Sequence, residues 1–485
     1  MKNRWQMPHP ATMFLLLTLA VIIVSWVCDI YGLSITLSPS GEEIRVQNLL
    51  NADGMRWMLQ NLITNFTSFT PLGMAVIAIF GLGLANHSGF IDACIRYSRR
   101  KHKNLSRYVI VWVIALGLFS NILGDAGYII LLPIAAAMFR SVGLSPIAGI
   151  ITAYVSVACG YSANIFLSII DPILSINTEK AAFNAHVWDS NIGPMCNYYF
   201  FFGSTIVIGF LIYYITSKSL LPSMQQGQET ISKVDYKPLS RKERRAFYLS
   251  LIIGAIYFIL FLLVATLPFG FLRGVDGGLL YSPFTMNILS ILSLGIAIIG
   301  TVYGFSSGRY RNDRDVVNGL ISAVDMLSIF FVIAFFASQL YACFNYSHLD
   351  KYIAVNFASL LTSMSASPLI TLILFILFTA LINLVLCSAT GKWAFMALIF
   401  VPYFAKIGVS PDVVQCAFRI GDCSTNAITP FLLYMPLVLT YMQQYNKQIT
   451  YGTLFRYTWR YTLYILIAWI ILFTFWYLCG ISFGR

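Results

Sequence analysis

The sequence predicts an all-α polytopic membrane protein, an inverted repeat of helices with two re-entrant hairpins and about nine transmembrane helices. The composition, the distribution of basic residues between loops and a set of recurring polar landmarks predict this fold. Of the 485 residues, 58% are hydrophobic and only 10% are charged, whereas a soluble domain carries about 25% charged residues. A water-soluble enzyme, a coiled coil and a disordered chain are therefore excluded.

Nine apolar runs are long enough to cross a bilayer. The first follows Lys2 and Arg4 and is too long for the core of a signal peptide, so we expect a retained helix. The nine runs lie near residues 11–33, 68–91, 145–174, 196–217, 246–268, 284–304, 326–347, 412–443 and 461–479.

Two further apolar stretches, 107–142 and 366–407, are each interrupted by a polar patch, at 120–125 and 387–392. If each stretch is a hairpin that returns to its side of entry, the loops on the N-terminal side hold 21 lysines and arginines, and the other loops hold 6. The positive-inside rule then places the N-terminus in the cytoplasm.

The hairpins divide the chain into two halves. Residues 1–217 form the predicted first half, with four spanning helices and the hairpin 107–142. Residues 246–485 form the second half, with five helices and the hairpin 366–407. The polar segment 218–245 is the predicted cytoplasmic linker. We interpret its basic residues as those of a solvated loop and not as a site that binds nucleic acid.

Polar landmarks recur in the two halves in the same order and at a nearly constant offset. They are Asn86 and Ser88 with Asn345 and Ser347 (+259), Asn121 with Asn383 (+262), and Ser162 and Asn164 with Ser424 and Asn426 (+262). By the charge distribution the first unit begins outside and the second inside, which is an inverted repeat typical of secondary transporters. Because interrupted backbone is tolerated at membrane depth only inside protein or along a wet cavity, we expect both tips and both broken helices to converge on one binding site.

Charged side chains in these apolar stretches cost roughly 2.5–3.5 kcal/mol each to insert. Arg419 and Asp422 lie three residues apart on one helical face. We expect Asp422 to hold the Arg419 guanidinium until a solute carboxylate binds it, and a purely structural ion pair is the alternative. The other charges are Asp125 and Lys392 at the hairpin tips and Asp171 in the first broken helix. For Asp125 and Asp171, structural and functional roles both stay open.

The coupling ion is expected to be a proton or sodium, and no cofactor is expected. Ser120, Asn121 and Thr390 offer neutral oxygens for a sodium site. The acidic residues named above could instead carry a proton, since burial favours the neutral carboxyl group, and we favour protons. Trp393, beside the second tip, could stack on an aromatic solute.

Several motifs, in order along nearly the whole chain, resemble the AbgT family, the p-aminobenzoyl-glutamate transporters. These motifs are 8–12 (Pro-His-Pro-Ala-Thr), 65–73 (Asn-Phe-Thr-Ser-Phe-Thr-Pro-Leu-Gly), 125–128 (Asp-Ala-Gly-Tyr), 160–164 (Gly-Tyr-Ser-Ala-Asn), 171–172 (Asp-Pro), 392–394 (Lys-Trp-Ala) and 419–422 (Arg-Ile-Gly-Asp) with Asn426, Thr429 and Pro430. The resemblance implies a homodimer in a bacterial inner membrane. It also implies ion-coupled secondary transport of p-aminobenzoyl-glutamate, related aromatic carboxylates or sulfonamide antimetabolites.

By position, the resemblance assigns a set of transport-site residues, to which the interrupted helices and tips add three neutral polar ones. The assigned residues are Asp171, Asn383, Trp393, Pro411, Arg419, Asp422 and Pro430, and the additions are Asn164, Thr390 and Asn426. Gly391 and Leu398 depart from the family pattern in the second hairpin, which leaves the solute preference open. The alternative function is an ion-coupled dicarboxylate or citrate-type carrier of similar hairpin architecture. An intramembrane enzyme is disfavoured, because no Ser/His or Cys/His pair lies at membrane depth.

Overall fold

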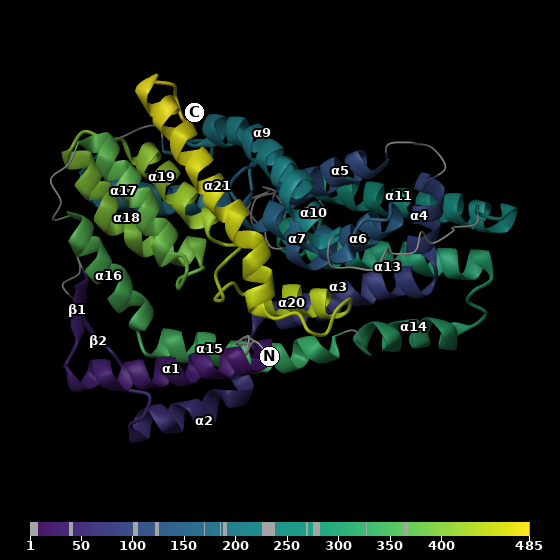
Figure 1. Cartoon of the computed structure of the whole chain (residues 1–485), viewed down its shortest axis with the longest axis horizontal. Helices are drawn as coiled ribbons and strands as arrows, with labels where there is room; N and C mark the ends of the chain where they lie inside the picture. The colour runs from purple at the N-terminus through teal and green to yellow at the C-terminus, as the bar shows by residue number, and fades with distance from the viewer. Residues whose placement is uncertain are drawn as a thin grey trace.

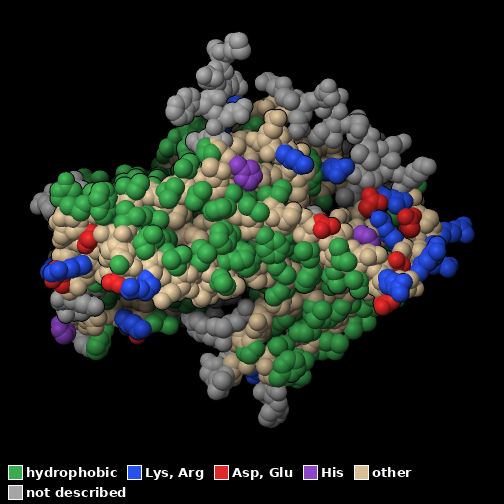
Figure 2. Space-filling view, turned by 90° about the horizontal axis from the view of Figure 1, so that it is seen from below, with side chains coloured by type: hydrophobic (Ala, Val, Ile, Leu, Met, Phe, Trp, Pro, Cys, Tyr) green, Lys and Arg blue, Asp and Glu red, His purple; other side chains and the backbone are tan. Residues whose placement is uncertain are grey.

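A chain of helices, with one small β-hairpin, makes up the part of the protein that the computed structural model describes. Figure 1 shows most helices lying along the longest axis. Figure 2 shows charged side chains gathered at both ends of that axis, with apolar side chains between them, as expected for a protein that crosses a bilayer. The described residues are 8–37, 42–99, 105–121, 126–168, 170–184, 186–187, 192–225, 238–267, 270–274, 282–325, 327–362 and 367–484.

Nine spanning units can be recognised in the described part of the chain, as the sequence predicts. Two are the interrupted helices α7–α8 and α19–α20, whose bounds are given below. The other seven are continuous or nearly continuous apolar helices: Pro10–Ile30, Ala52–His87, Tyr198–Met224, Arg241–Thr266, Ile288–Ser307, Ser328–Tyr346 and Tyr451–Leu478.

The helices of the first half follow each other in the order that the second half repeats. Proline occupies one of the first two positions of α1, α3 and α7, where its missing N–H leaves no helical hydrogen bond unmade. The elements of the first half are α1 (Pro10–Ile30), β1 (Ser34–Leu37), β2 (Glu42–Arg45), α2 (Ala52–Thr67), α3 (Thr70–His87), α4 (Phe90–Arg99), α5 (Leu105–Ser120), α6 (Ala126–Ser141), α7 (Pro146–Ala158), α8 (Ile170–Asn184) and α9 (Tyr198–Ile215).

The helices that correspond to those of the first half begin with α13, which packs on α3 as α1 packs on α15. Four elements lie between α9 and α13: η2 (Thr216–Leu220), α10 (Leu221–Gln225), α11 (Arg241–Thr266) and α12 (Pro283–Met286). The helices from there to the C-terminus are α13 (Ile288–Ser307), α14 (Asp313–Asp325), α15 (Ser328–Tyr346), α16 (Leu349–Thr362), α17 (Pro368–Ile382), α18 (Ala389–Lys406), α19 (Pro411–Ser424), α20 (Met435–Gln443) and α21 (Tyr451–Leu478). The boundaries 217 and 246 of the halves stay predictions, and residues 226–237 of the linker lie outside the described part.

The repeat is inverted in space. α1 packs against α15, and the corresponding pair in the other half is α13 against α3. In Figure 1, α2 and α15 lie towards the left end of the long axis, and α3 and α14 lie towards the right end. The chain therefore runs through α2 and α3 in one direction and through α14 and α15 in the other.

Two segments predicted as loops are partly helical. Residues 34–67 contain the β-hairpin and α2, and residues 305–325 contain α14. Both helices are amphipathic and less apolar than the helices that follow them, α3 and α15. α2 directly precedes the apolar helix α3, and α14 directly precedes the apolar helix α15. In each half, helical structure therefore begins before the apolar stretch that the sequence predicts to span the membrane.

The two hairpins pack against the interrupted helices. α5 and α6 contact α7 in the first half, and α17 contacts α19 in the second. Gly421 permits the second approach, because a Cβ at this position would lie 2.5 Å from the carbonyl oxygen of Ile376 and 2.6 Å from Cβ of Thr379. α8 crosses to the second hairpin, where it packs against α18.

Candidate functional site

The helix interruptions at 159–169 and 425–434 meet the hairpins around a cavity of about 220 Å³. Residues from both halves line the cavity, so it lies where the two repeats meet. Asp422 is its charged lining residue, and Ala389 and Thr390, the first residues of α18, also line it. The lining residues are Tyr128, Tyr161, Ile170, Cys387, Ser388, Ala389, Thr390, Asp422, Asn426, Leu432, Leu433 and Tyr434.

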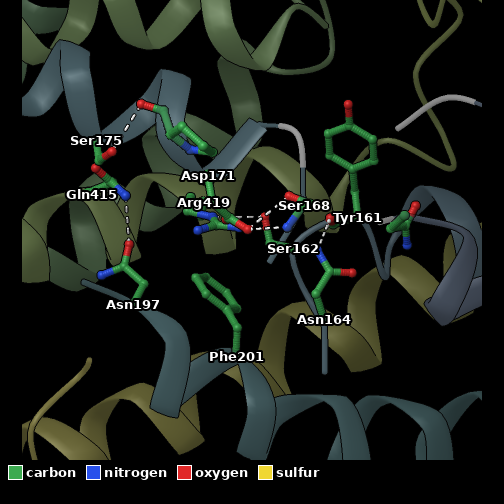
Figure 3. Close-up of polar contacts among 12 residues, drawn as sticks. Tyr161, Ser162, Asn164, Ser168, Asp171, Ser175, Asn197, Phe201, Gln415 and Arg419 are labelled. Atoms are coloured by element: carbon green, nitrogen blue, oxygen red, sulfur yellow. Dashed lines mark hydrogen bonds and ion pairs between the residues drawn. The ribbon is translucent and has the colours of Figure 1, made fainter. Parts of the chain in front are cut away.

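The first of two buried ion pairs beside this cavity joins α19 to α8. Nη2 of Arg419 lies 2.6 Å from Oδ1 of Asp171, and both side chains are at least nine-tenths buried. The other carboxylate oxygen of Asp171 accepts hydrogen bonds from the backbone N–H and the hydroxyl of Ser168, at 2.5 and 3.0 Å. The Arg419 guanidinium also donates from Nε to Ser162 at 3.2 Å and lies over the Phe201 ring (Figure 3). Ser168, Ser162 and Phe201 therefore all contact this ion pair.

The second ion pair joins α18 to α19. Nζ of Lys392 lies 2.7 Å from Oδ1 of Asp422, and both side chains are buried. The contact is an ion pair between two opposite charges inside the protein. The ammonium group also donates to Oδ1 of Asn383 at 2.7 Å and to the carbonyl of Leu386 at 2.9 Å.

The expected pairing of Arg419 with Asp422 is therefore wrong. Their spacing on α19 places them on one helical face, but each finds its partner on a different neighbouring element. Spacing along one helix shows that two side chains could meet; it says nothing about closer opposite charges on α8 and α18. Asp171 holds the Arg419 guanidinium, and Lys392 neutralises Asp422.

Asn383 and Asn426 tie the second hairpin tip to the second interruption. Nδ2 of Asn383 donates to Oδ1 of Asn426 at 2.8 Å and to Oγ1 of Thr425 at 3.1 Å. Asn426 donates in turn to the carbonyl of Ala158, at the end of α7. This chain of amides connects the interrupted helices of the two halves directly.

The corresponding residues of the first half are less fully bonded. Nδ2 of Asn121 donates to the carbonyl of Gly160, and Nδ2 of Asn164 donates to the carbonyl of Tyr161. The Oδ1 atoms of both asparagines are buried and have no hydrogen-bond partner among the described residues. Asp125 lies outside the described residues.

Trp393 does not face the cavity. Its side chain is fully buried, its Nε1 donates to Thr178 at 2.8 Å, and its ring packs on Phe418 at 4.5 Å. Thr178 donates onward to Gln415 at 2.5 Å. The role of Trp393 in solute stacking stays a prediction, and in this structure the indole joins α8, α18 and α19.

The remaining predicted residues occupy structural positions around the site. Pro411 is the first residue of α19, and Pro430 lies within the second interruption. Thr390 lines the cavity, but Ser120 and Asn121 are not among its lining residues, and Ser120 donates to the carbonyl of Gly117. The structure thus does not gather the three predicted sodium ligands around this cavity.

Sequence reasoning missed several residues of the site. Ser162 was a landmark of the repeat and Lys392 a recognised tip charge, yet neither was predicted to bind a solute or to position its ligands. Tyr128 and Tyr161 lie within the family motifs quoted above. Tyr434 stacks on Tyr128 with ring centroids 5.0 Å apart, but nothing marked it in a chain that is 15% aromatic.

Comparisons with known proteins agree along the whole chain. A model of the AbgT putative transporter family matches residues 3–485. The p-aminobenzoyl-glutamate transport protein of Escherichia coli (strain K12) is 29% identical over 482 residues, which cover 99% of this chain and 94% of that protein.

Two solved structures are similar in sequence and fold. The YdaH transporter of Alcanivorax borkumensis, described as having an unusual topology, is 33% identical with a TM-score of 0.55, covering 99% of this chain and 100% of that one. MtrF of Neisseria gonorrhoeae, described as illuminating a class of antimetabolite efflux pumps, is 34% identical with a TM-score of 0.53, covering 97% and 96%. These relatives are transporters and not enzymes.

Proposed function

Because the chain belongs to the AbgT transporter family, we propose that it is a proton-coupled carrier of p-aminobenzoyl-glutamate or a closely related aromatic carboxylate. The observation that carries the proposal is the pair of buried cations, Arg419 and Lys392, each neutralised by one aspartate beside the central cavity. The relative from Escherichia coli is a p-aminobenzoyl-glutamate transport protein, which supports the choice of solute.

The two cations suit the two carboxylates of this solute. Arginine presents a planar fork that binds a carboxylate with two parallel hydrogen bonds, whereas lysine acts as a compact point charge. Ser388, Ala389 and Thr390 bring the N-terminal end of α18 to the cavity wall, and the helix dipole there favours an anion. Tyr128, Tyr161 and Tyr434 supply aromatic walls for the benzoyl ring.

Solute binding is coupled to protons through the displaced aspartates. When a solute carboxylate binds the Arg419 guanidinium, Asp171 loses its counter-charge in a buried site. When it binds the Lys392 ammonium group, Asp422 does. An uncompensated buried carboxylate is strongly disfavoured, and the group becomes neutral by taking up a proton. Each exchanged pair thus binds one proton together with one carboxylate.

The setting of the carrier is part of the proposal. We place it as a homodimer in a bacterial inner membrane with its N-terminus in the cytoplasm. The excess of basic residues on the N-terminal side supports the orientation. The family resemblance supports the dimer and the membrane.

The test uses the full chain in proteoliposomes with imposed proton and sodium gradients varied separately. The solutes are p-aminobenzoyl-glutamate, p-aminobenzoate (a ring with one carboxylate), N-acetylglutamate (two carboxylates without a ring) and citrate. We expect transport of p-aminobenzoyl-glutamate that follows the proton gradient, with p-aminobenzoate and N-acetylglutamate each moved more slowly.

Two matched variants distinguish a loss of solute binding at the site from a general loss of folded protein. Arg419→Lys keeps the charge but removes the fork. Arg460→Lys makes the same substitution at an exposed arginine of α21 that bonds Ser219, outside the site. Preference for citrate, or equal loss of transport in both variants, would contradict the proposal. Transport that follows a sodium gradient at fixed pH and ignores a pH gradient would refute the proton coupling.

A further inference from the structure

We propose that the groove between α5 and α9 binds one anionic phospholipid, with an acyl chain along the groove and the phosphate group on Arg107 and Lys218. The two helices pack against each other (Figure 1), and the groove between them has a volume of about 690 Å³. Sites for small molecules have volumes of about 300–1,000 Å³. The groove therefore has room for a ligand and is more than a shallow furrow between two helices.

The walls of the groove suit hydrocarbon. Trp112 and Phe119 on α5 and Ile206 and Phe210 on α9 line it, and all four side chains are more than half exposed. Thr205 brings a hydroxyl group to the lining, but this hydroxyl already donates to the carbonyl of Phe201 in its own helix. In a protein that crosses a bilayer, an exposed apolar wall contacts lipid chains rather than water.

The groove has the length of one leaflet. On α5 its lining residues run from Val111 to Phe119, and on α9 they run from Thr205 to Tyr213. Eight residues of α-helix rise about 12 Å, and half of the hydrocarbon core of a bilayer is about 15 Å. A single acyl chain from one leaflet therefore matches the groove in length.

The two helices run antiparallel along the groove. Ile165, in the first helix interruption, lines the groove and accepts a hydrogen bond from the hydroxyl of Tyr198, the first residue of α9. The next residue, Phe166, contacts the ring of Phe119 near the end of α5, with centroids 5.8 Å apart. One end of the groove thus lies at the interruption. The other end lies where α5 begins and α9 ends.

Two exposed cations lie at this other end. Arg107 precedes Val111 by four residues, which places both on the same face of α5, and Lys218 follows Tyr213 by five residues. Neither cation takes part in an ion pair among the described residues. Basic residues at a membrane surface attract anionic lipids. A zwitterionic headgroup carries its own cation beside the phosphate, so an anionic headgroup fits these two charges better.

The fold of the hairpin does not require the cation on α5. The repeat offset of 262 residues places Leu369, in α17, at the position that corresponds to Arg107 in α5. The second hairpin therefore forms with an apolar residue there. In the orientation that the basic loops predict, Arg107 lies at the cytoplasmic leaflet, whose surface carries negative charge. A ligand from that leaflet accounts for the charge in the first half alone.

Lipid binding can be measured without any solute, so the test does not depend on the proposed function. The full chain is released from detergent micelles in a native mass spectrometer after titration with phosphatidylglycerol or with phosphatidylcholine of identical acyl chains. We expect one phosphatidylglycerol per chain to bind about tenfold or more tightly than phosphatidylcholine, the effect of two basic residues at an anionic headgroup.

Charge variants locate the headgroup. Arg107→Gln with Lys218→Gln should lower the affinity for phosphatidylglycerol to that for phosphatidylcholine. Arg244→Gln with Arg245→Gln is the matched control, because it removes two exposed cations from the same predicted cytoplasmic segment as Lys218. The control should keep the preference of the wild type.

A second pair of variants locates the acyl chain. Ala115 is an exposed residue that lines the groove, so Ala115→Trp should fill the groove and weaken the binding of both lipids. Ala20→Trp makes the same substitution at an exposed alanine of α1 and should bind both lipids as the wild type does.

Four results would overturn the proposal. Equal affinity of the wild type for the two lipids, or equal loss of preference in both charge variants, would remove the headgroup from Arg107 and Lys218. Unchanged lipid binding in Ala115→Trp would place the chain elsewhere. Conversion of a dimer into a monomer by Ala115→Trp, seen in the same spectra, would make the groove an interface between two copies. Transport of p-aminobenzoyl-glutamate can persist in all four cases, so failure here is distinct from failure of the proposed function.

Discussion

The pairing of the four buried charges can be tested by double-mutant cycles. Arg419 pairs with Asp171 at 2.6 Å and Lys392 with Asp422 at 2.7 Å, and all four side chains are at least nine-tenths buried. Removing one partner of a buried pair leaves the other charge uncompensated and costs about 3–5 kcal/mol. Arg419→Gln alone and Asp171→Asn alone should each destabilise the protein by about this amount.

The double variants distinguish the true partners. Arg419→Gln with Asp171→Asn leaves no unpaired charge, so it should cost far less than the sum of the singles, with a coupling energy of at least about 2 kcal/mol. Arg419→Gln with Asp422→Asn should cost about the sum, because Asp171 and Lys392 are then both uncompensated. The assay is reversible unfolding in mixed micelles of detergent and sodium dodecyl sulfate. Strong coupling between Arg419 and Asp422, with none between Arg419 and Asp171, would refute the pairing.

Three further predictions follow from individual contacts. Arg419→Lys should lower transport by about tenfold or more, since a hydrogen bond to a charged group contributes about 1.5–3 kcal/mol; an unchanged rate of p-aminobenzoyl-glutamate uptake in proteoliposomes would argue against the arginine fork. Gly421→Ala should destabilise the fold by about 1–3 kcal/mol, because its Cβ would collide with α17; an unfolding midpoint equal to that of the wild type would show that the helices can separate. Burial raises the pKa of Asp350 in α16, outside the spanning helices. Stability is therefore lost as pH rises through that raised value, and Asp350→Asn should raise the unfolding midpoint at neutral pH but not below about pH 3.9; an equal gain at both pH values would contradict this cause.

The sequence was sufficient to predict the fold class and the positions of both interruptions. Apolar length identifies a spanning helix, and the polar landmarks Asn121, Asn383, Asn164 and Asn426 lie at the tips and breaks because irregular backbone needs polar partners inside a membrane. Amphipathic α2 and α14 were not predicted, since a hydropathy pattern detects apolar spans and misses helices with one polar face.

The partners within the site could not be predicted from spacing. Arg419 and Asp422 lie on the same face of one helix, but their partners Asp171 and Lys392 come from elements that only tertiary packing brings close. The hydrogen bond from the indole N–H of Trp393 to Thr178 likewise joins α18 to α8, and no local pattern indicated it. Long-range contacts of this kind depend on how the two halves assemble, which local sequence patterns do not encode.

The most direct measurement counts the protons bound with solute. Purified protein in weakly buffered detergent solution, near neutral pH, is mixed with p-aminobenzoyl-glutamate while a pH indicator records proton uptake. If solute carboxylates replace Asp171 and Asp422 at Arg419 and Lys392, binding takes up protons, and Asp171→Asn reduces the number taken up. Saturable binding of p-aminobenzoyl-glutamate with no proton uptake would contradict the exchange of ion pairs.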